Sequence, residues 1–169
     1  MTAQSRILYL LRHAKSSWTN HQLDDHDRPL AKRGEDAASR LDDYVAATGI
    51  APDLVLCSSA RRTIMTLEGI ADLPANTSVL IEAGLYGAPS SDLLGRLHEV
   101  RDDAASVMMI GHNPGLETLA ALLIGGGDED LRRRVAAKFP TGALANLACD
   151  EDWSDLAPAD ATLVASREL

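Results

Sequence analysis

The stretch that decides the fold is Ile7-Leu8-Tyr9-Leu10-Leu11-Arg12-His13-Ala14-Lys15-Ser16, in which an apolar run ends on an arginine and a histidine. The run predicts a buried strand, and Arg12 and His13 follow where that strand ends. In an open α/β sheet, ligands bind beyond the carboxyl ends of the strands. An arginine there offers a planar fork of donors to a phosphate or carboxylate, and the adjacent histidine can bind or attack the same group.

Outward from this stretch, short apolar runs alternate with segments of helical period. The alternation is typical of βαβ units, so we expect an α/β fold, a three-layer αβα sandwich whose mostly parallel central sheet has about five or six strands. The strands are expected at residues 7–11, 54–57, 79–81, 107–110, 144–148 and 162–165. The helices are expected up to Thr48 with Gly49 as C-cap, from about Ala60 to Ala71 with Ser58-Ser59 as cap, from Ser90, over Leu116 to Leu123 with Gly125-Gly126-Gly127 ending it, and around Leu131 to Lys138.

The composition bounds the class of protein. The chain has 169 residues, of which 46% are hydrophobic, so we expect one domain over residues 1–169. No apolar run approaches the roughly 20 residues that cross a bilayer, and the amino terminus lacks a signal-peptide pattern, so we expect a cytoplasmic protein with no membrane partner. Cys57 and Cys149 each lie in an apolar segment and are interpreted as small buried hydrophobes.

The net charge of −9 opposes binding to nucleic acid, whose affinity for proteins comes mainly from Lys and Arg. A phosphate ligand would require a few cations concentrated in one pocket of an otherwise acidic protein. The arginines beside strand ends are the candidates for such a pocket. No pattern in the chain indicates an oligomeric state.

Charged side chains follow each of the first four expected strands. Arg12 with His13 follows the first, Arg61 with Arg62 the second, Glu82 the third and His112 the fourth. Because parallel strands end at the same edge of a sheet, these side chains should meet in one crevice. Two histidines and two arginines there form a site for a dianionic phosphoryl group, for which neither a metal ion nor a cofactor is required.

The arginines also predict the state of the first histidine. Nearby cations disfavour an imidazolium, so they should lower the pKa of His13 and leave one ring nitrogen free near neutral pH. A neutral imidazole can attack phosphorus and hold the phosphoryl group covalently, after which water releases phosphate.

Several segments, in order along the chain through about residue 124, resemble the histidine phosphatase superfamily, which includes the cofactor-dependent phosphoglycerate mutases. They are Leu11-Arg12-His13-Ala14-Lys15-Ser16-Ser17-Trp18, Arg28-Pro29-Leu30 with Gly34, Ser58-Ser59-Ala60-Arg61-Arg62-Thr63-Ile64-Met65-Thr66, Glu82 with Tyr86-Gly87, and Gly111-His112-Asn113-Pro114-Gly115. The short length and the Arg-Pro-Leu element are most similar to the SixA-type phosphohistidine phosphatases.

The resemblance implies a role for each matching residue. His13 would be the nucleophile, Arg12 and Arg62 would clamp the phosphate, and His112 would donate to it. Arg62 is preferred to its neighbour Arg61 because it keeps the family's distance from the flanking Ser58 and Thr66, and Arg61 is then expected on the helix exterior.

Glu82 lies in the region that often carries the family's proton donor, one residue further from Tyr86 than in the mutases. We therefore weigh a general acid against a solvated carboxylate at this position. Ala14 replaces the usual glycine, which requires only a negative φ. Substrate-binding candidates around the phosphate are Ser16, Arg28 and Asn113, although Ser16 is equally suited to capping a turn.

Other polar and aromatic residues have plainer interpretations. His21 with Asp24, Asp25, His26 and Asp27 contains metal-ligand types, but the spacing matches no known cage and a solvated acidic loop is favoured. Trp18 is interpreted as a packing residue beneath the site loop. Arg132-Arg133-Arg134 and His98 are expected on helix surfaces.

Together these observations predict a metal-independent phosphatase that hydrolyses phosphohistidine or a related phosphomonoester through a phosphorylated His13. Its partner would be a phosphorylated protein or a small phosphorylated metabolite. One alternative is a phosphatase or mutase for sugar or glycerate phosphates, in which Glu82 would protonate a poor leaving group. A non-catalytic phosphate-sensing module is the other alternative.

Overall fold

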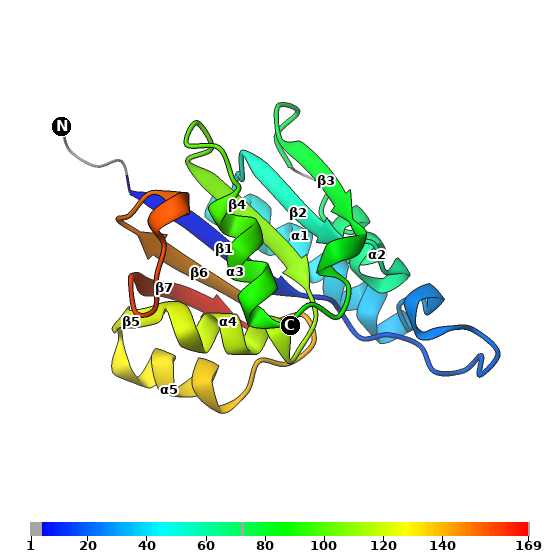
Figure 1. The fold of residues 1–169 in the computed structure, drawn as a ribbon. Helices are drawn as coiled ribbons and strands as arrows, with labels where there is room; N and C mark the ends of the chain where they lie inside the picture. Colours follow the sequence, from blue (N-terminus) through cyan, green and yellow to red (C-terminus); the bar gives the residue numbers. More distant parts are fainter. Residues whose placement is uncertain (1–4, 72, 169) are drawn as a thin grey trace.

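The computed structural model describes residues 5–71 and 73–168 of the chain. In this part seven strands form one sheet in the order β3-β2-β4-β1-β6-β7-β5 (Figure 1). The strands are β1 (Arg6–Arg12), β2 (Leu54–Ser58), β3 (Ser78–Glu82), β4 (Ser106–Gly111), β5 (Ile124–Gly127), β6 (Leu144–Cys149) and β7 (Ala161–Arg167). The expected α/β architecture is confirmed, with seven strands in place of five or six.

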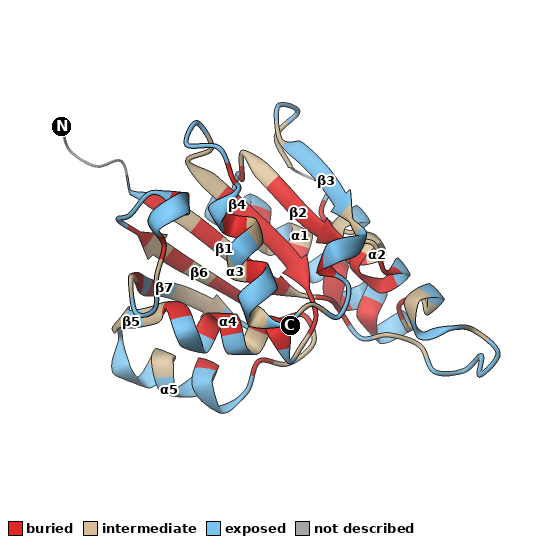
Figure 2. Cartoon of the chain, in the orientation of Figure 1, coloured by how far each residue is buried: buried red, intermediate tan, exposed pale blue. Residues whose placement is uncertain are grey.

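Helices cover both faces of the sheet (Figure 1). They are α1 (Lys32–Thr48), α2 (Arg61–Glu68), α3 (Ser90–His98), α4 (Gly115–Leu123) and α5 (Glu129–Ala137). One core cluster joins Leu11 of β1 to Leu41 of α1, and the other joins Leu10 of β1 to Leu97 of α3 and Leu119 of α4. Neighbouring residues of β1 therefore pack on opposite faces, as the two-residue repeat of a strand requires, and the central strands are buried on both sides (Figure 2).

Six of the seven strands of the described sheet run in one direction, and β6 runs in the opposite direction. Strands β3, β2, β4 and β1 are parallel, whereas β6 is antiparallel to both β1 and β7. Leu144 at the start of β6 consequently pairs with Leu11 near the end of β1. The chain that leads into β6, residues 138–143, therefore reaches the edge of the sheet where β1 ends.

The glycine triplet explains the additional strand. Gly125-Gly126-Gly127 was expected only to end a helix, but these residues form most of β5, which pairs with β7. A Cβ on Gly125 would lie 2.0 Å from the Ala159 carbonyl oxygen, and one on Gly127 would lie 2.4 Å from that of Leu163. Only glycine allows these backbones to approach so closely.

Of two expected helices, α3 begins at Ser90 as predicted, whereas α2 begins at Arg61 and ends earlier than predicted. The N-cap of α2 is Ala60, without a side-chain cap, and the helix ends at Glu68, before Gly69, instead of at Ala71. The N-cap of α3 is Pro89, and Ser90 is its first residue. Ser58 does not cap α2, and its hydroxyl instead forms a hydrogen bond with the His112 ring.

The predicted helix end at Gly49 and the predicted burial of both cysteines are confirmed. Gly49 ends α1 with φ +68°, and Cys57 and Cys149 are buried free thiols, in which burial raises the pKa to about 12. No helix in the described ranges is long and apolar enough to span a membrane.

Candidate active site

Three side chains meet where β1, β2 and β4 end. His13 directly follows β1, His112 directly follows β4, and Arg62 lies in the first turn of α2, which follows β2. Arg62 Nε lies 3.4 Å from His13 Nε2, and Arg62 Nη2 lies 3.3 Å from His112 Nδ1. The two imidazole centroids are 5.2 Å apart, and each of the three residues is 7% exposed. The structure thus brings together three of the residues that the sequence predicted for one crevice.

The hydrogen bonds of His13 define which nitrogen is free. Nδ1 lies 2.7 Å from the Ala14 carbonyl oxygen, which can only accept, so Nδ1 carries the proton. Nε2 therefore has an available lone pair facing Arg62. The Ala14 N–H donates to the Thr66 hydroxyl (3.0 Å), which donates to the Arg62 carbonyl oxygen (2.7 Å), and these bonds tie the loop after β1 to α2. The φ of Ala14 is negative, as expected.

His112 is held by Ser58, the last residue of β2. Its Nε2 lies 2.7 Å from the Ser58 hydroxyl oxygen, and its Nδ1 faces Arg62, which can only donate. Nδ1 is therefore the acceptor, and the proton lies on Nε2. Ser58 was considered in the sequence only as a helix cap, and its position before the Arg61-Arg62 pair gave no signal for a bond to a histidine 54 residues away.

Both histidines are neutral at ordinary pH, chiefly because they are buried. Burial lowers the pKa of His13 to about 4 and that of His112 to about 3. Arg62 and Arg12 lower both values further, but their effect is secondary to burial. The predicted direction is confirmed, whereas the cause given from the sequence, the neighbouring cations, is the smaller one.

Arg12 is the last residue of β1, and its guanidinium is held by the chain that leads into β6. Its Nη1 donates to the Phe139 carbonyl oxygen at 3.0 Å, and the amide Nδ2 of Asn113 donates to the same oxygen at 2.8 Å. Arg12 Nε and Asn113 Oδ1 are buried and have no hydrogen-bond partner in the described part of the chain. An unpaired buried N–H is costly, so Arg12 has a donor in reserve for an anion.

A hollow of about 190 Å³ opens beside these groups. Its lining residues are Arg12, His13, Lys15, Ser16, Trp18, Asp25, Arg62 and Thr141. Ser16 is thus among the residues that line the hollow. Trp18 is 57% exposed, so the expectation that it packs beneath the loop was wrong. The Arg28 guanidinium lies 3.5 Å from its ring centroid, and this cation–π contact holds Arg28 against Trp18.

Asp25 was expected in a solvated loop, but it is a member of the site. Its Oδ2 accepts from Arg62 Nη2 at 3.0 Å and from the Tyr86 hydroxyl at 2.7 Å, and its carbonyl oxygen accepts from Arg62 Nη1 at 2.6 Å. The Tyr86 hydroxyl, and then Arg62, hold the pKa of Asp25 below its usual range. Within the described ranges, no three His, Cys, Asp or Glu side chains are grouped so as to hold a metal ion.

Tyr86 forms an aromatic cover over the site. Its ring meets that of His112 edge to face at 5.5 Å and that of His26 at 4.9 Å. His26 in turn lies 2.9 Å, through Nε2, from the Ser59 hydroxyl oxygen. The sequence placed Tyr86 in a family segment but assigned it no contact.

Glu82 does not join the histidines. It is the last residue of β3, and in the described chain its carboxylate is bonded by the fork of Arg96, through Nε at 2.9 Å and Nη2 at 2.8 Å. The pair lines a separate hollow with Gly84 and Asp92. The expectation that Glu82 would face the crevice was wrong, because a bidentate arginine on α3 holds the carboxylate elsewhere.

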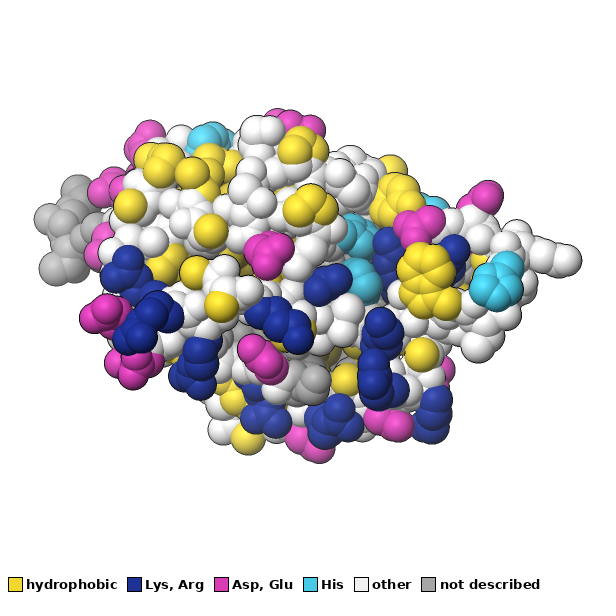
Figure 3. Space-filling model, turned by 90° about the horizontal axis from the view of Figure 1, so that it is seen from below, with side chains coloured by type: hydrophobic (Ala, Val, Ile, Leu, Met, Phe, Trp, Pro, Cys, Tyr) yellow, Lys and Arg dark blue, Asp and Glu magenta, His cyan; other side chains and the backbone are white. Residues whose placement is uncertain are grey.

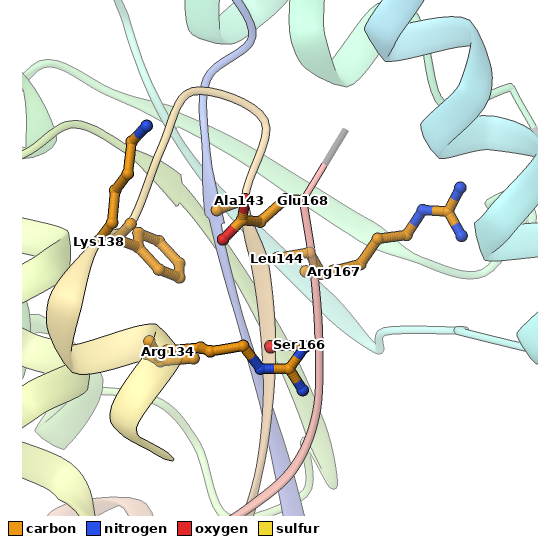
Figure 4. Close-up of a pocket in the computed structure, with 9 residues that line it drawn as sticks. Arg134, Lys138, Ala143, Leu144, Ser166, Arg167 and Glu168 are labelled. Atoms are coloured by element: carbon orange, nitrogen blue, oxygen red, sulfur yellow. The ribbon is translucent and has the colours of Figure 1, made fainter. Parts of the chain in front are cut away.

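The surface around the site is basic although the whole chain is acidic. Figure 3, which views the molecule from below, shows many Lys and Arg side chains on this face. A second hollow, of about 280 Å³, is lined by Arg134, Lys138 and Arg167, but their head groups point in different directions (Figure 4), and Arg167 lies 4.6 Å from the ring centroid of Tyr44. The cations that line the hollow beside His13 are Arg12, Lys15 and Arg62.

Comparisons with known proteins show the family and the fold. The family model of the histidine phosphatase superfamily, branch 1, matches residues 8–137. An uncharacterized protein of Mycobacterium tuberculosis is 37% identical over 158 residues, which cover 91% of this chain and 96% of the relative. An uncharacterized chloroplastic protein of Arabidopsis thaliana is 36% identical over 73% of this chain and 62% of its own length.

Two solved structures share the whole fold. A phosphohistidine phosphatase SixA candidate from Nakamurella multipartitia has a TM-score of 0.87 at 29% identity, covering 99% of this chain and 98% of its own. A second SixA candidate, from Agrobacterium tumefaciens, has a TM-score of 0.80 at 30% identity, covering 97% and 98%.

Proposed function

Because the chain belongs to the histidine phosphatase superfamily and is a phosphatase, we propose that it hydrolyses protein phosphohistidine through a covalent intermediate on His13, without a metal ion. The observation that carries the proposal is the position of Arg62, which lies within 3.4 Å of His13 Nε2 and 3.3 Å of His112 Nδ1. A phosphoryl group bound to Arg62 would therefore contact both imidazoles.

In the first step, the guanidinium groups of Arg12 and Arg62 bind phosphoryl oxygens and His13 Nε2 attacks phosphorus. The bond from phosphorus to the leaving group breaks as the new bond to nitrogen forms. The Nδ1–H bond to the Ala14 carbonyl stabilises the positive charge that develops on the His13 ring. Water then attacks the phosphorylated His13 and releases inorganic phosphate.

The contact of His112 with Ser58 suits it to donate to the phosphoryl group. A hydroxyl can donate or accept a hydrogen bond. In the tautomer of His112 whose proton is on Nδ1, the Ser58 hydroxyl can therefore donate a hydrogen bond to Nε2. With a phosphoryl oxygen in place of Arg62 as its neighbour, Nδ1–H becomes a donor. The neutral ring thus stabilises charge on the phosphoryl oxygens without first becoming charged itself.

The position of Glu82 supports an undemanding leaving group. A sugar alkoxide leaves poorly without a proton, and the Glu82 carboxylate is bound by Arg96. The carboxylate in the hollow beside His13 is that of Asp25, whose low pKa keeps it ionised and without a proton to donate to the leaving group. When the second nitrogen of a phosphohistidine ring is protonated, the imidazole departs as a neutral molecule, so phosphohistidine fits this pocket better than a sugar or glycerate phosphate.

The test is to trap the phosphoenzyme. We expect a phosphohistidine peptide labelled on phosphorus to transfer an acid-labile label to the protein in the presence of EDTA, and the His13→Ala variant to take up no label and lose hydrolysis. The matched control is His98→Ala on α3, whose ring is bonded to the Leu156 carbonyl and which should label normally. Labelling of His13→Ala, or loss of activity with the chelator, would contradict the mechanism.

A further inference from the structure

We propose that Asp25 makes the pocket specific for a phosphorylated imidazole by accepting a hydrogen bond from the ring nitrogen that does not carry the phosphoryl group. The inference rests on the proposed function and names the leaving group for which the pocket is suited. It gives a role to a carboxylate that neither the family segments nor the strand ends predicted.

The position of Asp25 within the hollow is the first argument. It lines the same hollow as His13 and Arg62, and it is the one acidic side chain among the described lining residues. Its Oδ2 is already occupied by Arg62 and Tyr86. In the described part of the chain its Oδ1 accepts no hydrogen bond, since Arg28 Nε, at 3.9 Å, is too far away. One carboxylate oxygen, on a side chain that is 51% exposed, is thus available to a ligand.

The second argument is that Asp25 is fixed relative to the phosphoryl site. Arg62 donates both to its carbonyl oxygen (2.6 Å) and to its carboxylate (3.0 Å), and residues 25–27 form a single 3-10 turn. The guanidinium that would bind the phosphoryl group therefore also sets the position of the carboxylate. A substrate held by its phosphoryl group would meet Asp25 with the next part of the molecule, which is the leaving group.

The chemistry of the leaving group completes the argument. When His13 Nε2 bonds to phosphorus, the electron pair of the breaking P–N bond returns to the substrate nitrogen. If the other ring nitrogen keeps its proton, the substrate ring leaves as neutral imidazole and no proton needs to be transferred. A carboxylate that accepts a hydrogen bond from this N–H favours the protonated ring. An ester has no such N–H, so it gains nothing from Asp25.

The experiment compares one nitrogen-linked and one oxygen-linked substrate. We expect Asp25→Asn to lower kcat/KM for a phosphohistidine peptide about tenfold more than kcat/KM for p-nitrophenyl phosphate, the ratio that corresponds to one charge-assisted hydrogen bond. The matched variant is Tyr86→Phe, which removes a bond to Oδ2 but keeps the carboxylate, so both substrates should be affected equally. Thermal melts check that both variants fold.

A pH profile separates hydrogen bonding to the substrate from the mere positioning of Arg62. The charged and titratable groups that face Asp25 are Arg62, Arg28, Tyr86 and the two buried histidines. Losing the carboxylate should move the alkaline limb of the phosphohistidine reaction to lower pH by about one unit and leave that of the ester unchanged.

The outcomes distinguish this inference from the proposed function. If the wild type hydrolyses phosphohistidine and Asp25→Asn reduces both substrates by the same factor with unshifted profiles, Asp25 only positions Arg62 and the inference is wrong. If the wild type hydrolyses the ester but not phosphohistidine, it is the proposed function that fails.

Discussion

The floor and the rim of the candidate active site are built in different ways. The floor is defined as His13, Arg62 and His112, and the rim as Trp18, Asp25, Arg28 and Tyr86. Floor residues follow buried parallel strands and are each 7% exposed, whereas Trp18 on the rim is 57% exposed. The rim comes from the loop after β1 and the turn after β3, and it is tied to the floor through Arg62. In the proposed function, the floor acts on the phosphoryl group and the rim contacts the leaving group.

Removing a floor cation should give the largest effect. We expect Arg62→Ala to lower kcat/KM for every phosphorylated substrate by about a hundredfold to a thousandfold, because a donor to the charged phosphoryl oxygens is lost from a buried site. Its neighbour Arg61 is exposed on the same helix, and Arg61→Ala should stay close to wild type. Steady-state kinetics of the two variants measure the contrast, and equal losses would mean that the adjacent arginines were wrongly distinguished.

An intermediate effect is expected when the pH is lowered. An ordinary histidine, with a pKa of about 6.5, is mostly charged at about pH 5. His13 and His112 should remain neutral there, because burial lowers their pKa to about 4 and about 3. Nitrogen chemical shifts from NMR, followed through the titration, measure this directly. Imidazolium signals from either ring at that pH would mean that water reaches the floor and that the pKa of that histidine is higher than stated.

The same pKa shifts have a consequence for stability. Below a pH of about 6.5 the unfolded chain binds protons on these two histidines, and the folded chain does not until the pH nears their lowered values. The free energy of unfolding should therefore fall as the pH drops through this window. Denaturant titrations across the window, with His112→Asn as the comparison, should give a shallower fall in the variant.

The smallest effect is expected at the third strand. Glu82 pairs with Arg96 outside the hollow, so Glu82→Gln should change kcat/KM for both phosphohistidine and an alkyl phosphate by less than about twofold. The paired variant Arg96→Gln should behave in the same way. A large loss of kcat/KM for the alkyl phosphate alone would instead indicate that Glu82 is the general acid and that the active site extends beyond the floor and the rim.

The floor was predictable from the sequence because it depends on short-range patterns. An apolar run followed by a charged residue is enough to place His13 or His112 at the end of a strand, and parallel strands bring such ends together. The rim was not predictable in this way. Asp25 meets Tyr86 across 61 residues of sequence, and no local pattern distinguishes a carboxylate that binds a tyrosine from one that binds water.

Local interpretation also failed where backbone packing outweighed propensity. Gly125 to Gly127 look like a helix end, yet tertiary contacts with Ala159 and Leu163 use their missing side chains to build an edge strand. Trp18 looks like a core residue, yet Arg28 covers one face of its ring outside the core. In each case the deciding partner lies in a segment that the local pattern does not contain.

The antiparallel direction of β6 has a practical consequence for where this enzyme can be cut. The family match ends at residue 137, so a fragment trimmed there would keep every imidazole and guanidinium of the reaction centre. It would nevertheless lose the Phe139 carbonyl, which orients both Arg12 and Asn113. Such a fragment would also lose β7 and β6, the strand that pairs with β1 along its length, so the remaining groups would lack the part of the sheet that positions them.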